Sequence, residues 1–375
     1  GRSLEQLADG LRKSLRELVG ERDLLSGILT SMREGVLLVD RDGRVALINP
    51  ALREMLFLRD EDVGKLPIEV IRDSSLHDLL DTVRRSQKPA QGEIDVTGIK
   101  PRKILVRAEV LEVEPGGLLV VFYDVTDLRR LETLRRDFVA NASHELRTPV
   151  TSIRSAVETI LAMPPGDTEA KARFFGIVER NAERLQQLIE DLLDLSKIES
   201  RELELASEPT NVRAVAERTI ALFSERAAKT KTTLELTVPR DLPEVLADAR
   251  ALEQVLFNLL DNAIKYCPGA KVTVGAENDD AHVMVWVRDT GPGIEAKHAD
   301  RLFERFYRVD AGRSRALGGT GLGLAIVKHL SEAMGGAVDV SSVVGEGTRF
   351  TLHLPFAEPP PRSHDSVDLR ESAAG

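Results

Sequence analysis

Residues 141–149 read Asn-Ala-Ser-His-Glu-Leu-Arg-Thr-Pro and lie in the first of two long helical patterns. Apolar residues recur every three to four positions from 128 to 146 in the first pattern and from 174 to 195 in the second. Between the two patterns, Pro164, Pro165 and Gly166 cannot continue a helix. The patterns therefore predict an antiparallel helical hairpin, and its wide apolar stripes predict that two copies pair into a four-helix bundle.

The apolar stripe of the first helix leaves His144 facing solvent, where a neutral imidazole can attack an electrophile. Glu145 adjoins it and can take a ring proton. Thr148 lies four residues on, so its hydroxyl shares the face of His144, and Pro149 predicts a bend beside the histidine. Taken alone, a surface histidine next to a glutamate is an ordinary solvated helix face.

The string from His144 to Pro149 resembles the phosphoacceptor box of sensor histidine kinases of two-component systems. The resemblance implies that His144 takes the γ-phosphoryl group of ATP on a ring nitrogen, with Glu145 as general base. It also implies that Thr148 helps to place a water for dephosphorylation of the partner protein. The expected partners are a second copy of the chain, giving a homodimer, and a response regulator whose aspartate receives the phosphoryl group.

Helical and strand patterns alternate from residue 205 to 356 and predict an α/β sandwich. On one predicted helix, Asn258, Asn262, Lys265 and Tyr266 lie close together. Two amide oxygens four residues apart can orient a hydrated Mg²⁺, and Lys265 can offset phosphate charge. The alternative for the two asparagines is that they satisfy local backbone groups.

Two glycine-containing segments follow in the same domain. Asp289-Thr290-Gly291-Pro292-Gly293-Ile294 ends a predicted strand, and a carboxylate there can accept the amino group of adenine, although an ordinary turn would look similar. Residues 318–324, Gly-Gly-Thr-Gly-Leu-Gly-Leu, lead into a helix and predict a phosphate cradle. A dinucleotide-binding fold is the competing interpretation, but no strand is predicted before these glycines.

The order of these segments, with residues 303–316 as a predicted lid, resembles the ATP-binding domain of the same kinases. The aromatic residues of the lid have core packing as their alternative role. By resemblance, the Mg²⁺ ligands are Asn258 and Asn262, and Thr348 supports the contact of Asp289 with adenine. By resemblance, the ATP site comprises Asn258, Asn262, Lys265, Tyr266, Asp289, Gly291, Gly293, Ile294, Phe303, Phe306, Arg308, Gly319, Thr320, Gly321, Leu322, Gly323 and Thr348. Cys267 stands where the family more often has Thr or Ser, which predicts a small residue that caps the helix.

The N-terminal part combines a heptad pattern with an α+β pattern. Leucines or methionine recur at 4, 11, 18, 25 and 32, which favours a parallel coiled coil over a helix lying on its own domain. Strands are predicted at 36–39, 45–48, 103–111 and 118–125, and residues 32–36 and 124–126 resemble a PAS sensor module. The fold class is therefore multidomain α+β. The predicted domains are a coiled-coil helix at 1–26, a PAS-like domain at 27–127, a dimerisation and phosphotransfer domain at 128–204, an ATP-binding domain at 205–356 and a disordered tail at 357–375.

Composition narrows the possible partners of the 375-residue chain. The net charge is -10, whereas a protein that neutralises nucleic-acid phosphates is normally basic, so no nucleic-acid binding is expected. Cys267 is the one cysteine, which excludes an internal disulfide and indicates a reducing compartment.

No apolar run reaches the roughly 18–20 residues that cross a bilayer, and the chain starts with Gly. We expect a cytoplasmic fragment, and the resemblance implies inner-membrane helices upstream in the full-length protein. The domain layout most resembles that of sensor kinases of the phosphate-regulon type.

Two other functions fit parts of this pattern. One is a hydrolytic ATPase: topoisomerase, chaperone and mismatch-repair families resemble this domain but place a glutamate, to activate water, where this chain has Asn258. A sensor scaffold would keep the nucleotide as a structural ligand only. The histidine kinase is the preferred interpretation because it alone uses both His144 and the nucleotide segments.

Overall fold

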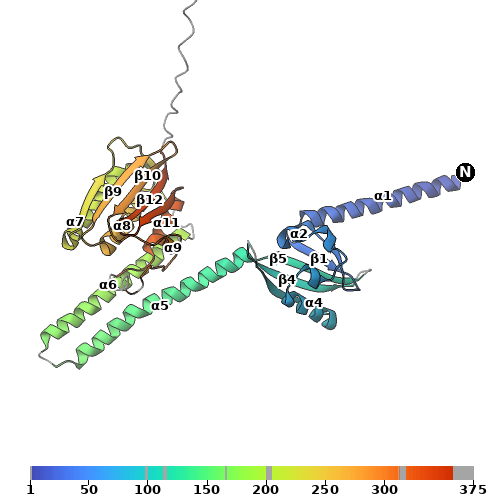
Figure 1. The fold of residues 1–375 in the computed structure, drawn as a ribbon, viewed down its shortest axis with the longest axis horizontal. Coiled ribbons are helices and arrows are strands. Elements are labelled where there is room, and N and C mark those ends of the chain that lie inside the picture. The colour runs from blue at the N-terminus through green and yellow to red at the C-terminus, as the bar shows by residue number, and fades with distance from the viewer. Residues whose placement is uncertain are drawn as a thin grey trace, which may run out of the picture. The chain divides into compact units, whose positions relative to one another are not determined.

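The structure is a computed structural model that describes residues 2–97, 100–112, 116–164, 167–199, 205–310, 312 and 318–357. The chain divides into two compact units, residues 1–137 and residues 138–375 (Figure 1). In the part of the chain that the structure describes, no helix is both long enough and apolar enough to span a bilayer. Residues 358–375 of the predicted tail lie outside the described residues.

The first unit contains a five-stranded antiparallel sheet with the strand order β2-β1-β5-β4-β3. The strands are β1 (Gly35–Val39), β2 (Val45–Ile48), β3 (Ala90–Val96), β4 (Arg102–Leu111) and β5 (Gly117–Asp124). The helices are α1 (Arg2–Ser31), α2 (Pro50–Leu56), η1 (Asp60–Asp62), α3 (Pro67–Val70) and α4 (Ser74–Ser86). The predicted hairpin and the two later strands are present, whereas β3 and α4 were not predicted.

One buried polar side chain, Asn49, connects α1, the sheet and α2. Its Oδ1 accepts hydrogen bonds from the backbone N–H groups of Val36 (2.8 Å) and Leu52 (3.0 Å). Its Nδ2 donates to the backbone carbonyls of Leu29 and Glu34. Asn49 thus caps α2 and ties the end of α1 to β1, because every one of its polar atoms is used between elements.

In the heptad segment, the structure shows one continuous helix. At its repeating position, Leu11, Leu18 and Leu25 are each more than half exposed in the single chain, whereas Met32, directly after the helix, is partly buried. Leu4 and Leu7 lie outside the residues whose side chains are described. The predicted domain boundaries after residues 26 and 127 fall inside α1 and α5 (Thr126–Ala162), respectively.

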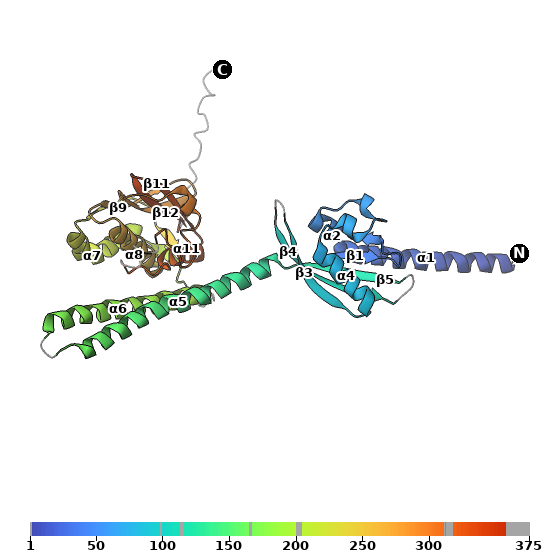
Figure 2. The same ribbon diagram turned by 60° about the horizontal axis from the view of Figure 1, so that its bottom comes forward.

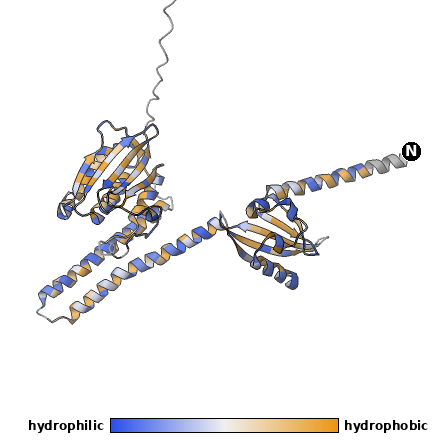
Figure 3. Cartoon of the chain, viewed as in Figure 1, coloured by the Kyte–Doolittle hydropathy of each residue, from blue (hydrophilic) through white to orange (hydrophobic). Residues whose placement is uncertain are grey.

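The second unit begins with the helical hairpin. Helices α5 and α6 (Thr168–Glu199) run side by side, as the two views of the ribbon agree (Figures 1 and 2). Polar and apolar residues alternate along both helices (Figure 3). Several apolar side chains on them remain exposed in the single chain, including Val139, Val150, Leu161, Phe175 and Leu193. Of the predicted connector, Pro165 and Gly166 lie outside the described residues.

The rest of the unit is a sheet covered by helices. The sheet has the order β11-β12-β10-β9-β7, with only β7 and β9 parallel among its neighbours. Its strands are β7 (Thr233–Thr237), β9 (Lys271–Asn278), β10 (His282–Asp289), β11 (Ala337–Val343) and β12 (Gly347–Pro355). The helices are α7 (Val212–Thr230), α8 (Ala249–Tyr266), α9 (Ala296–Ala299) and α11 (Gly323–Ala333), and a small ladder pairs β6 (Glu208–Thr210) with β8 (Val245–Ala247). This is the predicted α/β sandwich.

The core of the sandwich extends onto the hairpin. Leu188, Leu195 and Ile198 of α6 belong to the same buried cluster as the inner residues of α8, α11 and the sheet. Leu195 is fully buried, and Leu188 is 2% exposed. Because burying a leucine stabilises by roughly 1.5–3 kcal/mol, this apolar seam holds α6 against the sandwich and sets the position of the polar residues beside it.

Candidate functional site

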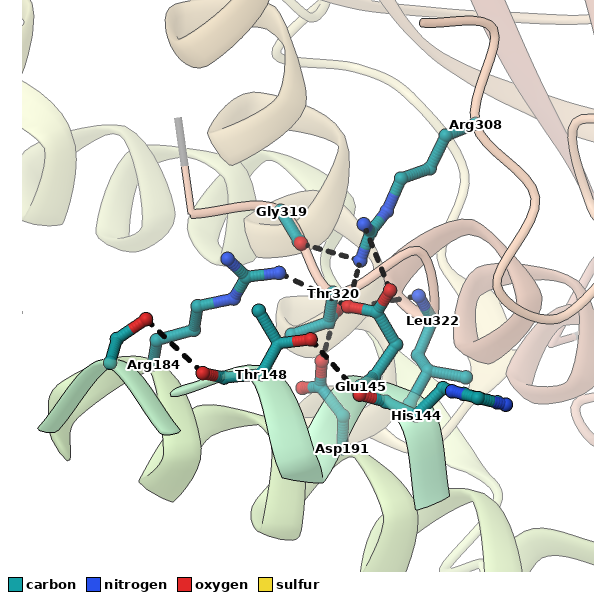
Figure 4. A network of polar contacts seen from close by, with 10 residues as sticks. His144, Glu145, Thr148, Arg184, Asp191, Arg308, Gly319, Thr320 and Leu322 are labelled. Atoms are coloured by element: carbon teal, nitrogen blue, oxygen red, sulfur yellow. Dashed lines mark hydrogen bonds and ion pairs between the residues drawn. The ribbon is translucent and has the colours of Figure 1, made fainter. Parts of the chain in front are cut away.

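The histidine and its neighbour on α5 occupy different environments. His144 is exposed, as predicted, whereas Glu145 is 9% exposed. Figure 4 shows the imidazole ring and the Glu145 carboxylate pointing in different directions. The helix continues through Pro149 to Ala162, and the Thr148 hydroxyl donates a hydrogen bond to the backbone carbonyl of His144 (3.1 Å). In this arrangement the hydroxyl of Thr148 serves the helix backbone.

The carboxylate of Glu145 binds two arginines from different elements (Figure 4). Arg184 of α6 approaches Oε2 to 3.1 Å. Arg308, from the segment after α9, places Nη2 3.0 Å from Oε2 and Nη1 3.4 Å from Oε1. The side chains of all three residues are at least 88% buried. Buried ion pairs of this kind lose much stability when one partner is removed, so the contact fixes how α5, α6 and the sandwich meet.

Arg308 also contacts the glycine segment, residues 318–324, which leads into α11. Its Nη2 donates to the backbone carbonyl of Gly319 at 2.8 Å. Next along this segment, the Thr320 hydroxyl donates to Oδ2 of Asp191 on α6 at 2.6 Å. The Asp191 carboxyl is buried, and this burial raises its pKa above the usual 3.8 despite hydrogen bonds from Thr320 and Gln187. Two carboxylates of the hairpin therefore hold the glycine segment, one directly and one through Arg308.

A cavity of about 530 Å³ opens between this segment, α8 and the end of β10. Most of the predicted ATP-site residues line it: Asn258, Asn262, Lys265, Tyr266, Asp289, Gly293, Ile294, Arg308, Gly319, Thr320, Gly321, Gly323 and Thr348. Gly291, Phe303, Phe306 and Leu322 are not among the lining residues. Asp191 and Cys267 also line the cavity and were not predicted there. The order of sequence segments thus corresponds to one cavity.

At one end of the cavity, the buried carboxylate of Asp289 is held in place by neighbours. Its Oδ1 accepts from the backbone N–H of Gly291 (2.8 Å) and from the thiol of Cys267 (3.3 Å). Cys267 is the C-cap residue of α8, as predicted, and its thiol adds a contact that the sequence did not indicate. Thr348 of β12 is paired directly with Asp289 of β10, so the two residues predicted to act together are cross-strand neighbours.

The residues predicted to handle phosphates lie along α8 and the glycine segment. The Nζ of Lys265 is 2.5 Å from Asp261, which also binds Arg226. Asn258 faces the start of α11, where its Oδ1 would lie 3.4 Å from a Cβ added to Gly323. Lys265 is therefore paired with a carboxylate here, and the amide of Asn258 lies beside the N-terminus of α11.

Aromatic residues of the predicted lid pack inward. Phe303 meets Phe350 edge-on, with ring centroids 6.3 Å apart, and Phe306 lies 5.9 Å from Phe138 of α5. This packing agrees with the alternative that these rings serve a core. Gly321 has φ +75° and would place a Cβ only 2.9 Å from Cα of Phe306, so the glycine permits the close approach. Residues 311 and 313–316 of the lid lie outside the described residues.

The chemistry of the cavity fits a hydrated magnesium ion bound with a triphosphate. Within the described ranges, no three His, Cys, Asp or Glu side chains gather into a metal-binding group. Mg²⁺ keeps several waters and needs only one or two protein ligands beside phosphates. Asn258 and Asn262 line the cavity, and their neutral amide oxygens fit such a role.

Three protein-family profiles match the chain in order. The PAS fold matches residues 23–125, the His Kinase A (phospho-acceptor) domain matches residues 134–201, and the histidine kinase-, DNA gyrase B-, and HSP90-like ATPase matches residues 247–358. His144 and Glu145 lie inside the second match, and the cavity residues of α8 and the glycine segment lie inside the third.

Two relatives that align with nearly the whole chain agree with these matches. The chain is 33% identical over 350 residues to the sensor histidine kinase WalK of Bacillus subtilis, covering 90% of this chain and 56% of that protein. It is 31% identical over 360 residues to a sensor protein kinase WalK of Staphylococcus aureus, covering 94% of this chain and 86% of that protein. A solved structure of the Acinetobacter baumannii histidine kinase AdeS shares 30% identity, with a TM-score of 0.48, covering 57% of this chain and 98% of that one.

The chain thus spans little more than half of the Bacillus relative and most of the Staphylococcus one. The three matched domains, their order and the identity to these relatives agree with the residues gathered around Glu145 and Asp289. The chain belongs to the sensor histidine kinases.

Proposed function

We propose that the chain is an ATP-dependent protein-histidine kinase that phosphorylates its own His144 and passes the phosphoryl group to an aspartate of a response regulator. One observation carries the proposal. Glu145, next to the exposed His144, shares Arg308 with Gly319 of the glycine segment. The phosphoacceptor helix and the nucleotide cavity therefore belong to one connected polar network.

In the proposed complex, the adenine lies at the Asp289 end of the cavity and the phosphates lie along the glycine segment. The carboxylate of Asp289 accepts the adenine amino group, and its buried, preorganised position suits a fixed recognition contact. Backbone N–H groups at the start of α11 face the phosphates. Asn258 and Asn262 would hold a hydrated Mg²⁺, which offsets phosphate charge when bound.

The proposed chemical step is an in-line displacement at the γ-phosphorus. The lone pair of a His144 ring nitrogen forms the N–P bond while the bond from phosphorus to the β,γ-bridging oxygen breaks. ADP leaves with that electron pair. The proton on the other ring nitrogen passes to Glu145, which keeps the imidazole nucleophilic. This step requires Glu145 to turn toward His144 and away from Arg308, which it contacts here.

Two partners follow from this proposal. A second copy of the chain would cover the apolar side chains that α5 and α6 leave exposed, completing a four-helix bundle. A response regulator would present its aspartate to phosphorylated His144. Thr148, exposed one turn from His144, would then help to place a water that dephosphorylates the regulator.

The test is incubation of the full chain with Mg²⁺ and ATP labelled at the γ-phosphate. The proposal predicts protein-bound label that is stable in alkali, lost in acid and absent from His144→Gln. Release of free phosphate without labelled protein would instead support a hydrolytic ATPase. Binding of ATP with neither outcome would support a scaffold for which the nucleotide is a structural ligand.

A further inference from the structure

Arg308 faces both the hairpin and the nucleotide cavity. Its side chain is 6% exposed, and it lines the cavity beside Gly319 and Gly321. The two Nη atoms bind Glu145, and Nη2 also binds the Gly319 carbonyl. Arg308 is thus the direct link between the residue next to His144 and the segment that faces the phosphates.

One nitrogen of this guanidinium donates to none of the described residues. The Nε of Arg308 is buried and has no hydrogen-bond partner among the described residues. It lies beside the glycine segment, because a Cβ added to Gly321 would lie 3.2 Å from it. A buried donor without an acceptor is costly, and among the buried arginine Nε atoms that lack a described partner, that of Arg308 lines the nucleotide cavity. A phosphate oxygen at the glycine segment is the acceptor that this donor fits.

The same guanidinium cannot keep its present partners and also bind a phosphate with its full fork. Both Nη atoms donate to Glu145, and Nη2 also donates to the Gly319 carbonyl. A polyphosphate carries more negative charge than one carboxylate, so it competes well for a bidentate arginine. Arg184 stays with Glu145 in that exchange, because both residues belong to the hairpin.

We propose that Glu145 and the terminal phosphate of the nucleotide compete for Arg308, so that Glu145 is withheld from His144 until the phosphate draws the arginine away. The proposal rests on the proposed kinase function and adds its control. Arg308 is a positioning residue for Glu145 in one state and for the phosphate in the other. The Thr320–Asp191 hydrogen bond also favours the state without phosphate, because it ties the glycine segment to a second carboxylate of the hairpin.

The test is a double-mutant cycle in the full chain with Glu145→Gln, Arg308→Gln and the double variant. The dissociation constant is measured with Mg²⁺ and an ATP analogue that has a non-hydrolysable β,γ bridge. Glu145→Gln should tighten binding by about tenfold, because it releases Arg308, and Arg308→Gln should weaken it by about tenfold. In the Arg308→Gln background, Glu145→Gln should change binding by less than about twofold.

The matched control is Glu158→Gln, an exposed glutamate on the same helix that should leave binding unchanged. Glu145→Gln should also lower the rate of His144 phosphorylation, although it binds the analogue more tightly. A purely structural defect would lower both the rate and the affinity. Circular dichroism of each variant checks that the chain is folded.

Unchanged or weaker binding by folded Glu145→Gln would overturn the competition for Arg308 while leaving the kinase function standing. Equal tightening by Glu145→Gln with and without Arg308 would also overturn it. Failure of the wild-type chain to bind the analogue at all would instead contradict the proposed function itself.

Discussion

At the scale of single residues, the proposed adenine contact depends on the carboxylate of Asp289. Its carboxylate is 7% exposed and receives an N–H and a thiol donor, so it is held before any ligand arrives. A fixed acceptor gains affinity because no side-chain freedom is lost on binding. Cys267 contributes to this although the sequence predicted only a helix cap.

Asp289→Asn should therefore weaken binding of the ATP analogue by about tenfold or more, because a hydrogen bond to a charged group contributes roughly 1.5–3 kcal/mol. The dissociation constant can be measured by isothermal titration calorimetry. Asp279→Asn is the control, since Asp279 lies in the exposed turn before β10, at the opposite end of the strand. An equal effect of both substitutions would contradict the assignment.

Asp191 offers a test by pH. Burial raises its pKa, with Asp194 adding to the increase and Lys265 and the hydrogen bonds from Thr320 and Gln187 opposing it. A raised pKa in the folded state means that the protonated form favours folding. The protonated Asp191 carboxyl therefore contributes to the free energy of unfolding at acid pH. That contribution is lost as the pH rises from about 3.8 through the raised pKa of the folded state.

We therefore expect Asp191→Asn to gain in unfolding free energy relative to the wild type as the pH rises from the acid range to neutrality. Urea unfolding at a series of pH values gives this difference directly. The Asn side chain keeps the size of Asp but does not titrate. Parallel stability curves for the two proteins would show that Asp191 is not buried in this way.

These residues also show what could be read in advance. The exposure of His144 followed from the apolar stripe of its helix, and the gathering of Asn258, Asp289 and the glycines followed from the order of the segments. Arg184 and Asp191 were missed because nothing local distinguishes them on the polar face of α6. Their roles arise only when α6 packs against the sandwich, which no local pattern contains.

At the scale of elements, that packing of α6 is an apolar seam. Leu188 and Leu195 are buried with residues of α8 and α11, although a leucine stripe on a hairpin helix first indicates contact within the bundle. The sequence therefore predicted the helix and its apolar face correctly but not the second surface that it covers.

Leu195→Ala should lower the unfolding free energy by about 2–5 kcal/mol, because it leaves a cavity at a fully buried position. Leu222→Ala on α7, which is 63% exposed, should change it by less than about 1 kcal/mol. Guanidinium unfolding of both variants makes the comparison. A small effect of Leu195→Ala would mean that α6 does not depend on this seam.

The glycine segment can be tested with a matched pair. Gly318 and Gly321 both have φ +75°, but a Cβ at Gly318 meets no described residue within 4 Å, whereas at Gly321 it meets the backbone of Phe306 at 2.9 Å. Alanine at either position costs about 1–2 kcal/mol for the left-handed backbone. Gly321→Ala should cost more in unfolding free energy and should also weaken binding of the ATP analogue. If the two substitutions lowered the free energy of unfolding equally, the close contact of Gly321 with Phe306 would not matter for stability.

At the scale of the whole molecule, the chain consists of two units with separate cores. The first carries the PAS fold that the sequence indicated, and α5 continues from it into the second unit. The second unit joins the phosphoacceptor helix to the nucleotide cavity through Glu145, Arg308 and the glycine segment. The account of function therefore depends on whether the phosphoryl group of ATP reaches His144.

That question is answered most directly by locating the phosphoryl group. The full chain is incubated with Mg²⁺ and ATP, digested at mildly alkaline pH and mapped by mass spectrometry. The account predicts a phosphohistidine at His144 and its loss in His144→Gln. A phosphoryl group at another residue, or none on a chain that binds ATP, would contradict it.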